Sequence, residues 1–283
     1  MLRILVIDGN TRDVNARHIA CGGLATGDFY ARVLRKIFPD LAIDIVHPAD
    51  GAGTTHAALA EFDGLVWTGS ALNAYNPVPE VRSQIDLARK AFLTSTPMFG
   101  SCWGLQVAAI AAGGEVGRAR NGREIVVARD IELTEAGRNH PLFTGKPARF
   151  DAIAVHGDEI VTRPAAMRVL AANAHSPVQA AEIKLGGGFW GTQYHPEYDL
   201  QEIAVVMRRY GDRLVRDGTF PSAAAREQAT SELSELGRDP ARSDLAAKYG
   251  VGASVLDPAI RYREILNWLT IRVAPAAATR ARG

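Results

Sequence analysis

Apolar residues along the chain form short continuous runs that alternate with stretches of helical spacing. Residues 2–7 are a run of the kind that is buried on both faces of a parallel sheet. Apolar side chains at helical spacing then occupy 27–38, and short runs return at 43–47 and 64–67. A second helix is predicted over 79–92. This order predicts an α/β fold with an open, mostly parallel sheet, helices on both faces, and functional loops at the carboxyl ends of the strands.

The pattern becomes more strand-like after the middle of the chain. Residues 123–168 indicate a β-rich section laid beside the main sheet. Residues 178–183 and 188–194 predict a hairpin that turns at Gly186-Gly187. A helix over 201–216 is expected to close a first domain that spans residues 1–216.

The remaining residues differ in character and predict a helical appendage over 217–273. One helix is expected over 222–236, and a second begins at Asp257-Pro258, with proline at its first position. The second helix carries an apolar stripe with Trp268 near its edge; the stripe comprises Tyr262, Ile265, Leu266 and Leu269. We expect the appendage to pack on the core, the alternative being an interface for a partner or a second copy of the chain. Residues 274–283, rich in alanine and arginine, are expected to be disordered.

Composition limits the classes of function. The chain has 283 residues, of which 47% are hydrophobic, enough for one large α/β domain with an appendage. A formal net charge of +1 gives no reason to expect nucleic acid or an anionic membrane as partner. The two cysteines suit a reducing cytoplasm, and no signal segment or membrane-spanning run is recognisable.

Cofactor motifs are equally lacking in the sequence. It contains no P-loop, no glycine-rich dinucleotide turn and no Cys/His metal cluster, so we expect neither a cofactor nor a metal. Five histidines scattered among loops and element ends are interpreted as surface residues: His18, His47, His56, His140 and His175.

The segment Gly100-Ser101-Cys102-Trp103-Gly104 presents a cysteine at a predicted strand-to-helix turn. A short strand is expected at 97–99, and a helix over 105–112 that stops at Gly113-Gly114. Such a turn strains the backbone and lifts its side chain clear of the sheet, and glycines two residues before and after provide the room. The sulfur would then lie at a helix N-terminus, which favours the thiolate. The alternative is a buried structural cysteine flanked by incidental glycines.

A second candidate motif is Gln193-Tyr194-His195-Pro196-Glu197. An imidazole and a carboxylate two residues apart point to the same side of an extended backbone, and the proline between them stiffens the spacing. His-Pro-Glu alone commonly forms just a turn. Together with the cysteine motif, it predicts Cys102 as nucleophile, His195 as general base and then acid, and Glu197 as the residue that orients the histidine.

These motifs resemble those of the class I (triad) glutamine amidotransferases, particularly stand-alone relatives of the glutaminase domain of GMP synthase. Residues 100–106 match G-x-C-x-G-x-Q, and residues 193–197 match Q-F-H-P-E. Residues 63–70 are similar to the strand that ends in the family's Gly-Gly-Pro oxyanion turn, although Thr68 and Ser70 replace the first glycine and the proline. Residues 155–159 are similar to the S-H-G-D segment beside the bound glutamine. The resemblance covers about residues 1 to 215.

The resemblance implies hydrolysis of the glutamine side-chain amide, or of another γ-glutamyl amide, through a thioester on Cys102. Backbone N–H groups of Gly69 and Trp103 would stabilise the oxyanion. Three further residues would lie on the substrate side: Gln106, His156 and Asp158. For Gln106 the alternative is a polar residue on the helix that faces a neighbouring loop. The sequence leaves the roles of His156 and Asp158 equally undecided.

Three functions fit the sequence. The first is a glutaminase subunit that delivers ammonia to a separate synthetase. The second is a self-contained γ-glutamyl hydrolase or peptidase, and the third is a catalytically silent binding or regulatory protein. The intact triad argues against the third. The segment after residue 216 is too short for an ATP-pyrophosphatase domain, which excludes a complete fused synthetase but not a separate one.

Overall fold

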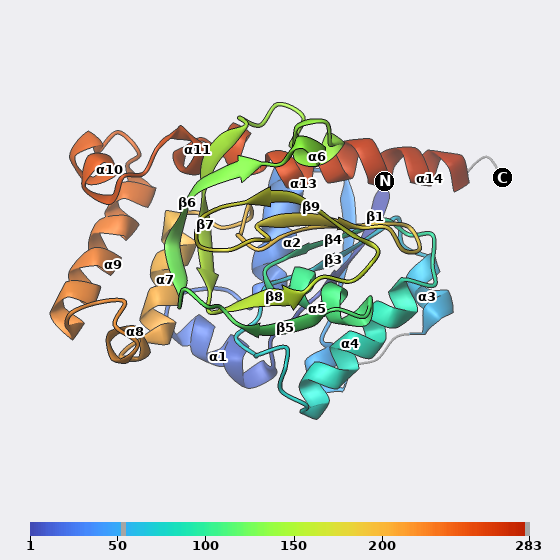
Figure 1. Cartoon of the computed structure of the whole chain (residues 1–283), viewed down its shortest axis with the longest axis horizontal. Helices are drawn as coiled ribbons and strands as arrows, with labels where there is room; N and C mark the ends of the chain where they lie inside the picture. Colours follow the sequence, from blue (N-terminus) through green and yellow to red (C-terminus); the bar gives the residue numbers. More distant parts are fainter. Residues whose placement is uncertain (52–54, 281–283) are drawn as a thin grey trace.

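A nine-stranded sheet forms the centre of the protein, with strand order β2-β1-β3-β4-β11-β10-β9-β6-β7 (Figure 1). The structure, a computed structural model, describes residues 1–51 and 55–280. The first five strands of this order are mutually parallel: β2 (Leu41–Val46), β1 (Leu2–Ile7), β3 (Gly64–Trp67), β4 (Met98–Ser101) and β11 (Phe189–Thr192). The predicted parallel core is therefore confirmed, with β4 between β3 and β11.

The remaining strands of the sheet are antiparallel. The predicted hairpin is β10 (Ala180–Ile183) against β11, and β9 (Met167–Ala172), β6 (Glu124–Leu133) and β7 (Arg149–His156) continue the sheet outward. The predicted β-rich section thus extends the main sheet. A separate two-stranded sheet pairs β5 (Glu115–Arg118) with β8 (Asp158–Thr162).

Helices cover both faces of the parallel strands because successive residues of a strand point to opposite sides. Ile4 and Val6 of β1 pack in one cluster with α2 (Thr26–Ile37), and Leu5 and Ile7 pack in another with α4 (Pro79–Ala91) and α5 (Trp103–Ala111). The side chains of each continuously apolar run are therefore divided between two hydrophobic cores, one on each face of the sheet.

Several elements differ from the sequence prediction. The helix expected over 201–216 ends at Tyr210 as α7 (Leu200–Tyr210), because Gly211 adopts φ 55° and stops it before α8 (Arg213–Arg216). Helix α1 (Arg12–Ala20) was not predicted, because only Val14, Asn15 and His18 are buried along it. Short elements that were also not predicted are η1 (Pro48–Asp50), α3 (His56–Ala60), α6 (Glu135–Arg138) and η2 (Pro141–Phe143).

The C-terminal segment has two parts that lie in different places (Figure 1). The first part extends to one side of the sheet, with α9 (Ala223–Arg238) packed on α7; it also comprises α10 (Ser243–Tyr249) and α11 (Ala253–Leu256). The second part runs along the sheet and comprises α12 (Pro258–Arg261), α13 (Arg263–Asn267), the π-helical segment η3 (Trp268–Val273) and α14 (Ala274–Arg280). Residues 274–280, expected to be disordered, thus form a helix, and Arg280 donates to the carbonyls of Ala60 and Phe62; the rest of that expected tail lies outside the described residues.

The second part is embedded in the core rather than resting on it. Trp268, predicted at the edge of the apolar stripe, is fully buried in the cluster of β1 and α2, whereas Leu266 is only half-buried. Fully buried Glu264 accepts hydrogen bonds from the Tyr194 hydroxyl and from the Lys146 ammonium, the latter at 3.0 Å. The C-terminal helices therefore hold the residue that immediately precedes His195.

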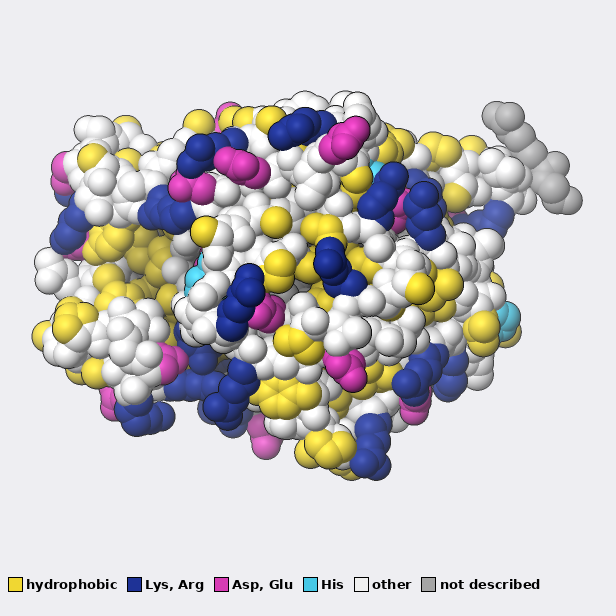
Figure 2. Space-filling view, viewed as in Figure 1, with side chains coloured by type: hydrophobic (Ala, Val, Ile, Leu, Met, Phe, Trp, Pro, Cys, Tyr) yellow, Lys and Arg dark blue, Asp and Glu magenta, His cyan; other side chains and the backbone are white. Residues whose placement is uncertain are grey.

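The surface shows no large field of one charge on the face drawn in Figure 2, where acidic and basic side chains are interspersed. A hollow with a hydrophobic floor opens on this face beside α9 and α10. Among the described residues, no helix is both long enough and apolar enough to cross a membrane.

Candidate active site

Three neighbouring parallel strands end at the same edge of the sheet and carry the predicted catalytic residues there. Cys102 directly follows β4, His195 lies just beyond β11, and Gly69 lies just beyond β3. The register pairs Thr192 with Ser101 and Trp67 with Gly100, so the three chain segments leave the sheet side by side. Residues far apart in the sequence thus meet because their strands are hydrogen-bonded neighbours.

Cys102 occupies a strained strand-to-helix turn. Its backbone has φ 50° and ψ −97°, in a region that residues other than glycine seldom adopt, and it forms the N-cap of α5. A Cβ at Gly104 would lie 2.6 Å from the Cβ of Trp67, and one at Gly100 would lie 3.0 Å from the backbone of Gly104. The two glycines therefore allow this turn to pack against the sheet.

The His195 ring is held by Glu197 on one edge. His195 Nδ1 lies 2.6 Å from Glu197 Oε1, and both side chains are almost completely buried. Burial alone would lower the pKa of His195, but the Glu197 carboxylate and a hydrogen bond with the Cys102 sulfur outweigh it and raise the pKa to about 10. The structure thus places the imidazole next to the Glu197 carboxylate and near the Cys102 sulfur.

A second set of contacts fixes Glu197. Its other oxygen, Oε2, accepts a hydrogen bond of 2.7 Å from Ser101 Oγ, which lies 3.2 Å from the Tyr30 hydroxyl. All three side chains are buried, so both carboxylate oxygens have partners within the protein. Ser101 lies inside the cysteine motif, but its side-chain partner could not be recognised from the sequence.

The turn after β3 is held by side chains of this chain. Thr68 Oγ1 donates to the carbonyl of Gly69 at 2.9 Å and accepts from Gly9 N–H at 2.9 Å. Asn10 Oδ1 accepts from Ala71 N–H at 2.8 Å on the far side of the turn. The threonine that departs from the family pattern therefore supplies hydrogen bonds that hold this turn.

A cavity of about 350 Å³ opens from Cys102 to the surface, and its volume falls within the range typical of small-molecule sites. The three predicted substrate-side residues, Gln106, His156 and Asp158, all line it. His195 and Glu197 do not line it and lie buried. The cavity also includes residues that the sequence did not single out: Asn73, Tyr75, Arg118, Arg123, Tyr210, Arg213 and Asp217. No motif in the sequence marks them, because they come from three separate stretches of the chain, 73–75, 118–123 and 210–217.

The predicted substrate-side residues differ in how much bonding capacity they retain. Gln106 Nε2 donates to Asp158 O and to Gln193 Oε1, both at 3.2 Å, which leaves its own Oε1 for a ligand. The Asp158 carboxylate accepts from Asn73 and Tyr75. Among the described residues, Gln106 Oε1 thus has no hydrogen-bond partner, whereas each oxygen of the Asp158 carboxylate has one.

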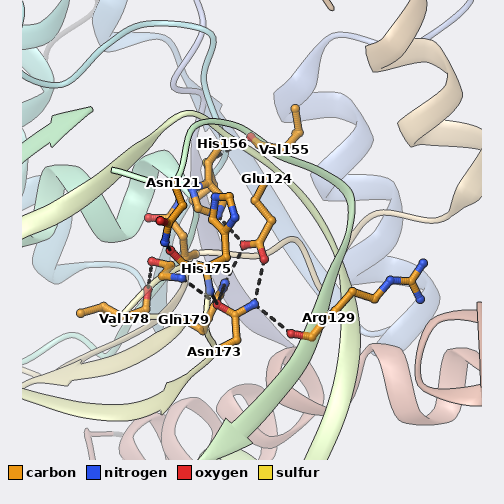
Figure 3. Close-up of polar contacts among 12 residues, drawn as sticks. Asn121, Glu124, Arg129, Val155, His156, Asn173, His175, Val178 and Gln179 are labelled. Carbon is orange, nitrogen blue, oxygen red and sulfur yellow. Dashed lines mark hydrogen bonds and ion pairs between the residues drawn. The ribbon is translucent and has the colours of Figure 1, made fainter. Parts of the chain in front are cut away.

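His156 is held by a buried polar network (Figure 3). Its Nδ1 lies 3.0 Å from Asp158 O, and its Nε2 lies 2.9 Å from Glu124 Oε2. Glu124 also accepts from Asn173 and Gln179. Burial would raise the pKa of Glu124, but these hydrogen bonds and His156 lower it overall. Because both of its ring nitrogens have protein partners, His156 shapes the cavity wall.

The histidines interpreted as surface residues are not all exposed. His18 is buried against Glu202, with 2.7 Å between Nε2 and Oε1, and buried His140 lies 3.5 Å from Glu182. For these two the prediction was wrong, because helix α7 and strand β10 cover them.

Among the described residues, no cluster of three or more potential ligands could hold a metal.

Comparison with known proteins identifies the family of the chain. The model of the family "Glutamine amidotransferase class-I" matches residues 31–209. The chain is 36% identical to a γ-glutamyl-L-1-hydroxyisopropylamide hydrolase from a Pseudomonas species, over 98% of this chain and 95% of that protein. It is 32% identical to the glutamine-hydrolysing GMP synthase of Thermomicrobium roseum, over 73% of this chain and 37% of that protein. The crystal structure of a glutamine amidotransferase from Thermotoga maritima has the same fold, with a TM-score of 0.61 and 20% identity over 86% of this chain and 98% of that one.

Proposed function

Because the chain belongs to the class-I glutamine amidotransferase family, we propose that it is a self-contained hydrolase of γ-glutamyl amides that acts through Cys102, His195 and Glu197. The observation that carries this proposal is the buried His195–Glu197 pair, with 2.6 Å between Nδ1 and Oε1, beside a Cys102 sulfur that lines the cavity. Such a constellation suits acyl transfer through a thioester.

In the first half of the reaction, the proton of the Cys102 thiol passes to His195, and the sulfur attacks the γ-carbonyl carbon of the amide. The negative charge that develops on the carbonyl oxygen is stabilised by the N–H groups of Gly69 and Trp103; Trp103 is the first residue of α5, where N–H groups lack intrahelical partners. His195 then donates a proton to the amine nitrogen as the C–N bond breaks. The products are the free amine and a γ-glutamyl thioester.

In the second half, His195 removes a proton from water, which attacks the thioester carbonyl. The C–S bond breaks, glutamate leaves, and the proton returns to the cysteine–histidine pair. Glu197 keeps the imidazole in one orientation through both steps, and Ser101 keeps Glu197 in place. The reaction releases free energy and needs no ATP.

Two observations favour a self-contained hydrolase over a glutaminase subunit. The turn that would form the oxyanion hole is held by Thr68 and Asn10 of the same chain, so no partner is needed to order it. The likeness to the Pseudomonas γ-glutamyl amide hydrolase also extends through the C-terminal helices, covering 98% of this chain.

The test is hydrolysis by the purified protein alone, without ATP, of L-glutamine, a γ-glutamyl alkylamide and the matching α-glutamyl alkylamide. We expect the γ-glutamyl alkylamide to be cleaved at least as fast as glutamine, and the α-glutamyl compound to be left intact. Cleavage of glutamine alone would instead favour a glutaminase subunit, in line with the similarity to GMP synthase. Absence of cleavage of every γ-glutamyl compound would refute the hydrolase proposal.

A further inference from the structure

Basic side chains outnumber acidic ones along the outer part of the cavity. Arg118, Arg123 and Arg213 line it, together with the carboxylates of Asp158 and Asp217. Arg118 and Arg213 are exposed, whereas Cys102 at the inner end is buried. The two exposed arginines therefore lie toward the mouth of the cavity.

The carboxylate that lies opposite Arg118 in the sheet is hydrogen-bonded to other residues. The register of β5 and β8 pairs Arg118 directly with Asp158, an arrangement that commonly produces a cross-strand ion pair. Asp158 instead accepts from Asn73 Nδ2 at 2.6 Å and from the Tyr75 hydroxyl at 3.3 Å, both on the loop after β3. Within residues 1–51 and 55–280, no carboxylate lies within 4.0 Å of the Arg118 guanidinium.

Arg213 is in the same situation. Asp217 follows it by four residues, the spacing of a helical ion pair. The Asp217 carboxylate is held by Arg123 Nε at 2.9 Å and by Thr219 Oγ1 at 2.8 Å. Arg213 lies beside the Tyr210 ring, 5.7 Å from its centroid, and forms no ion pair in the part of the chain that the structure describes.

We propose that Arg118 and Arg213 form a carboxylate-binding subsite at the mouth of the cavity, and that this subsite holds an anionic group of the substrate. The inference rests on the proposed function, because it assigns the subsite to a γ-glutamyl amide attached at Cys102. Arg123 is not part of it, since Asp217 already neutralises that guanidinium. Guanidinium groups suit this task because their planar donors match the geometry of a carboxylate.

The carboxylate could come from either side of the cleaved bond. One source is the α-carboxylate of the γ-glutamyl group, and the other is a carboxylate on the departing amine, as in a γ-glutamyl amino acid. Four substrates separate the two. γ-Glutamylethylamide carries only the α-carboxylate, γ-glutamylglycine carries both, 4-aminobutanoylglycine carries only the one on the amine, and 4-aminobutanoylethylamide carries neither.

The experiment measures kcat/KM on these four substrates for the wild type, Arg118→Gln and Arg213→Gln. Arg120→Gln and Arg216→Gln are matched controls, because both arginines are exposed near the same segments and neither lines the cavity. We expect losses of ~10- to 100-fold for substrates that carry the bound carboxylate and little change for the others. A loss confined to the two γ-glutamyl compounds assigns the α-carboxylate, and a loss confined to the two glycine conjugates assigns the amine side.

Equal losses on all four substrates, or no loss on any, would overturn the subsite. Binding provides a readout independent of turnover: γ-glutamylglycine is titrated by calorimetry into Cys102→Ala with and without each arginine substitution. Weaker binding in both arginine variants supports the subsite even if the wild type cleaves none of the four compounds, an outcome that would refute only the proposed hydrolase. Unchanged binding would overturn the subsite whatever the activity.

Discussion

The Tyr198 ring lies flat on the His195 imidazole, with 4.0 Å between the ring centroids and an angle of 9° between the planes. On another side of the imidazole is Gly69, where a Cβ would lie 2.6 Å from His195 Cε1. Phe29 packs against Tyr198 edge to face, with centroids 5.7 Å apart. The imidazole is thus held by packing as well as by its hydrogen bond to Glu197.

This packing predicts different results for two substitutions of Tyr198. Tyr198→Phe keeps the stacked ring and should retain kcat within about threefold. Tyr198→Leu removes the flat surface and should lower kcat by ~10-fold or more with little change in KM. The His195 imidazole can then rotate away from its productive plane. Steady-state kinetics on a γ-glutamyl alkylamide measure both values. Equal kcat values in the two variants would show that stacking does not position His195.

Cys102→Ala and Cys102→Ser should abolish amide hydrolysis while leaving the fold intact, because the position requires a nucleophile more than a given volume. Cys21→Ser is the matched control, since Cys21 lies at the end of α1 and does not line the cavity. It should retain wild-type activity. Circular dichroism checks the fold, and residual turnover in the Cys102 variants would end the assignment of the nucleophile.

His195→Ala should reduce turnover far more than Glu197→Gln, because the histidine carries out the proton transfers and the carboxylate orients it. The pH dependence adds a second readout. In the wild type the pKa of His195 is raised to about 10 despite burial, so the imidazolium that protonates the amine persists at neutral pH and is lost as the pH rises through about 10.

In Glu197→Gln the largest influence that raises this pKa is gone, whereas burial, which lowers it, remains. The alkaline limb of the kcat/KM profile should therefore move to lower pH by more than one unit. An unchanged limb would show that it reports a group other than His195.

Gly69→Ala should lower kcat by ~100-fold or more, because the added Cβ would overlap His195 and displace either the ring or the oxyanion turn. Gly252→Ala is a suitable control, since a Cβ there would meet no atom of residues 1–51 and 55–280 within 4 Å. The unfolding midpoint in urea should change little in either variant. Wild-type kcat in Gly69→Ala would mean that the turn and the imidazole are farther apart during catalysis.

The buried Lys146–Glu264 pair, with 2.9 Å between Nζ and Oε1, should matter for stability. Burial lowers the pKa of Lys146, and Glu264 offsets part of that effect. Glu264→Gln would leave an uncompensated buried ammonium and should lower the free energy of unfolding by ~3–5 kcal/mol, measured by urea denaturation.

The double substitution Lys146→Met/Glu264→Leu removes both charges and should cost much less than Glu264→Gln alone. Glu232→Gln, which breaks the half-exposed pair with Lys248, is the control and should cost under about 1 kcal/mol. A cost of Glu264→Gln no greater than that of the control would mean that the buried pair contributes little.

Local sequence was sufficient for much of the fold and for the candidate catalytic residues. Apolar runs and helical spacing depend on near neighbours in the chain, so β1, α2, β3, α4 and the β10–β11 hairpin lie where they were predicted. The Gly100 and Gly104 spacing around Cys102 reflects a turn of a few residues, and His195 and Glu197 are only two residues apart. Interactions of this range leave a recognisable pattern in the sequence.

Contacts between distant segments left no such pattern. The stacking of Tyr198 on His195, the Ser101–Glu197 hydrogen bond and the insertion of Glu264 beside Tyr194 each depend on which strands are neighbours and which helix crosses them. The guanidinium groups of Arg118 and Arg213, which form no ion pair within the described part of the chain, are a further example, because each depends on a carboxylate being bound by a third segment. Periodicity specifies which face of an element is buried, but the partner of that face is chosen by packing among all the elements together. The candidate catalytic residues could therefore be predicted from the sequence, whereas the residues that support them and the walls of the cavity required the folded molecule.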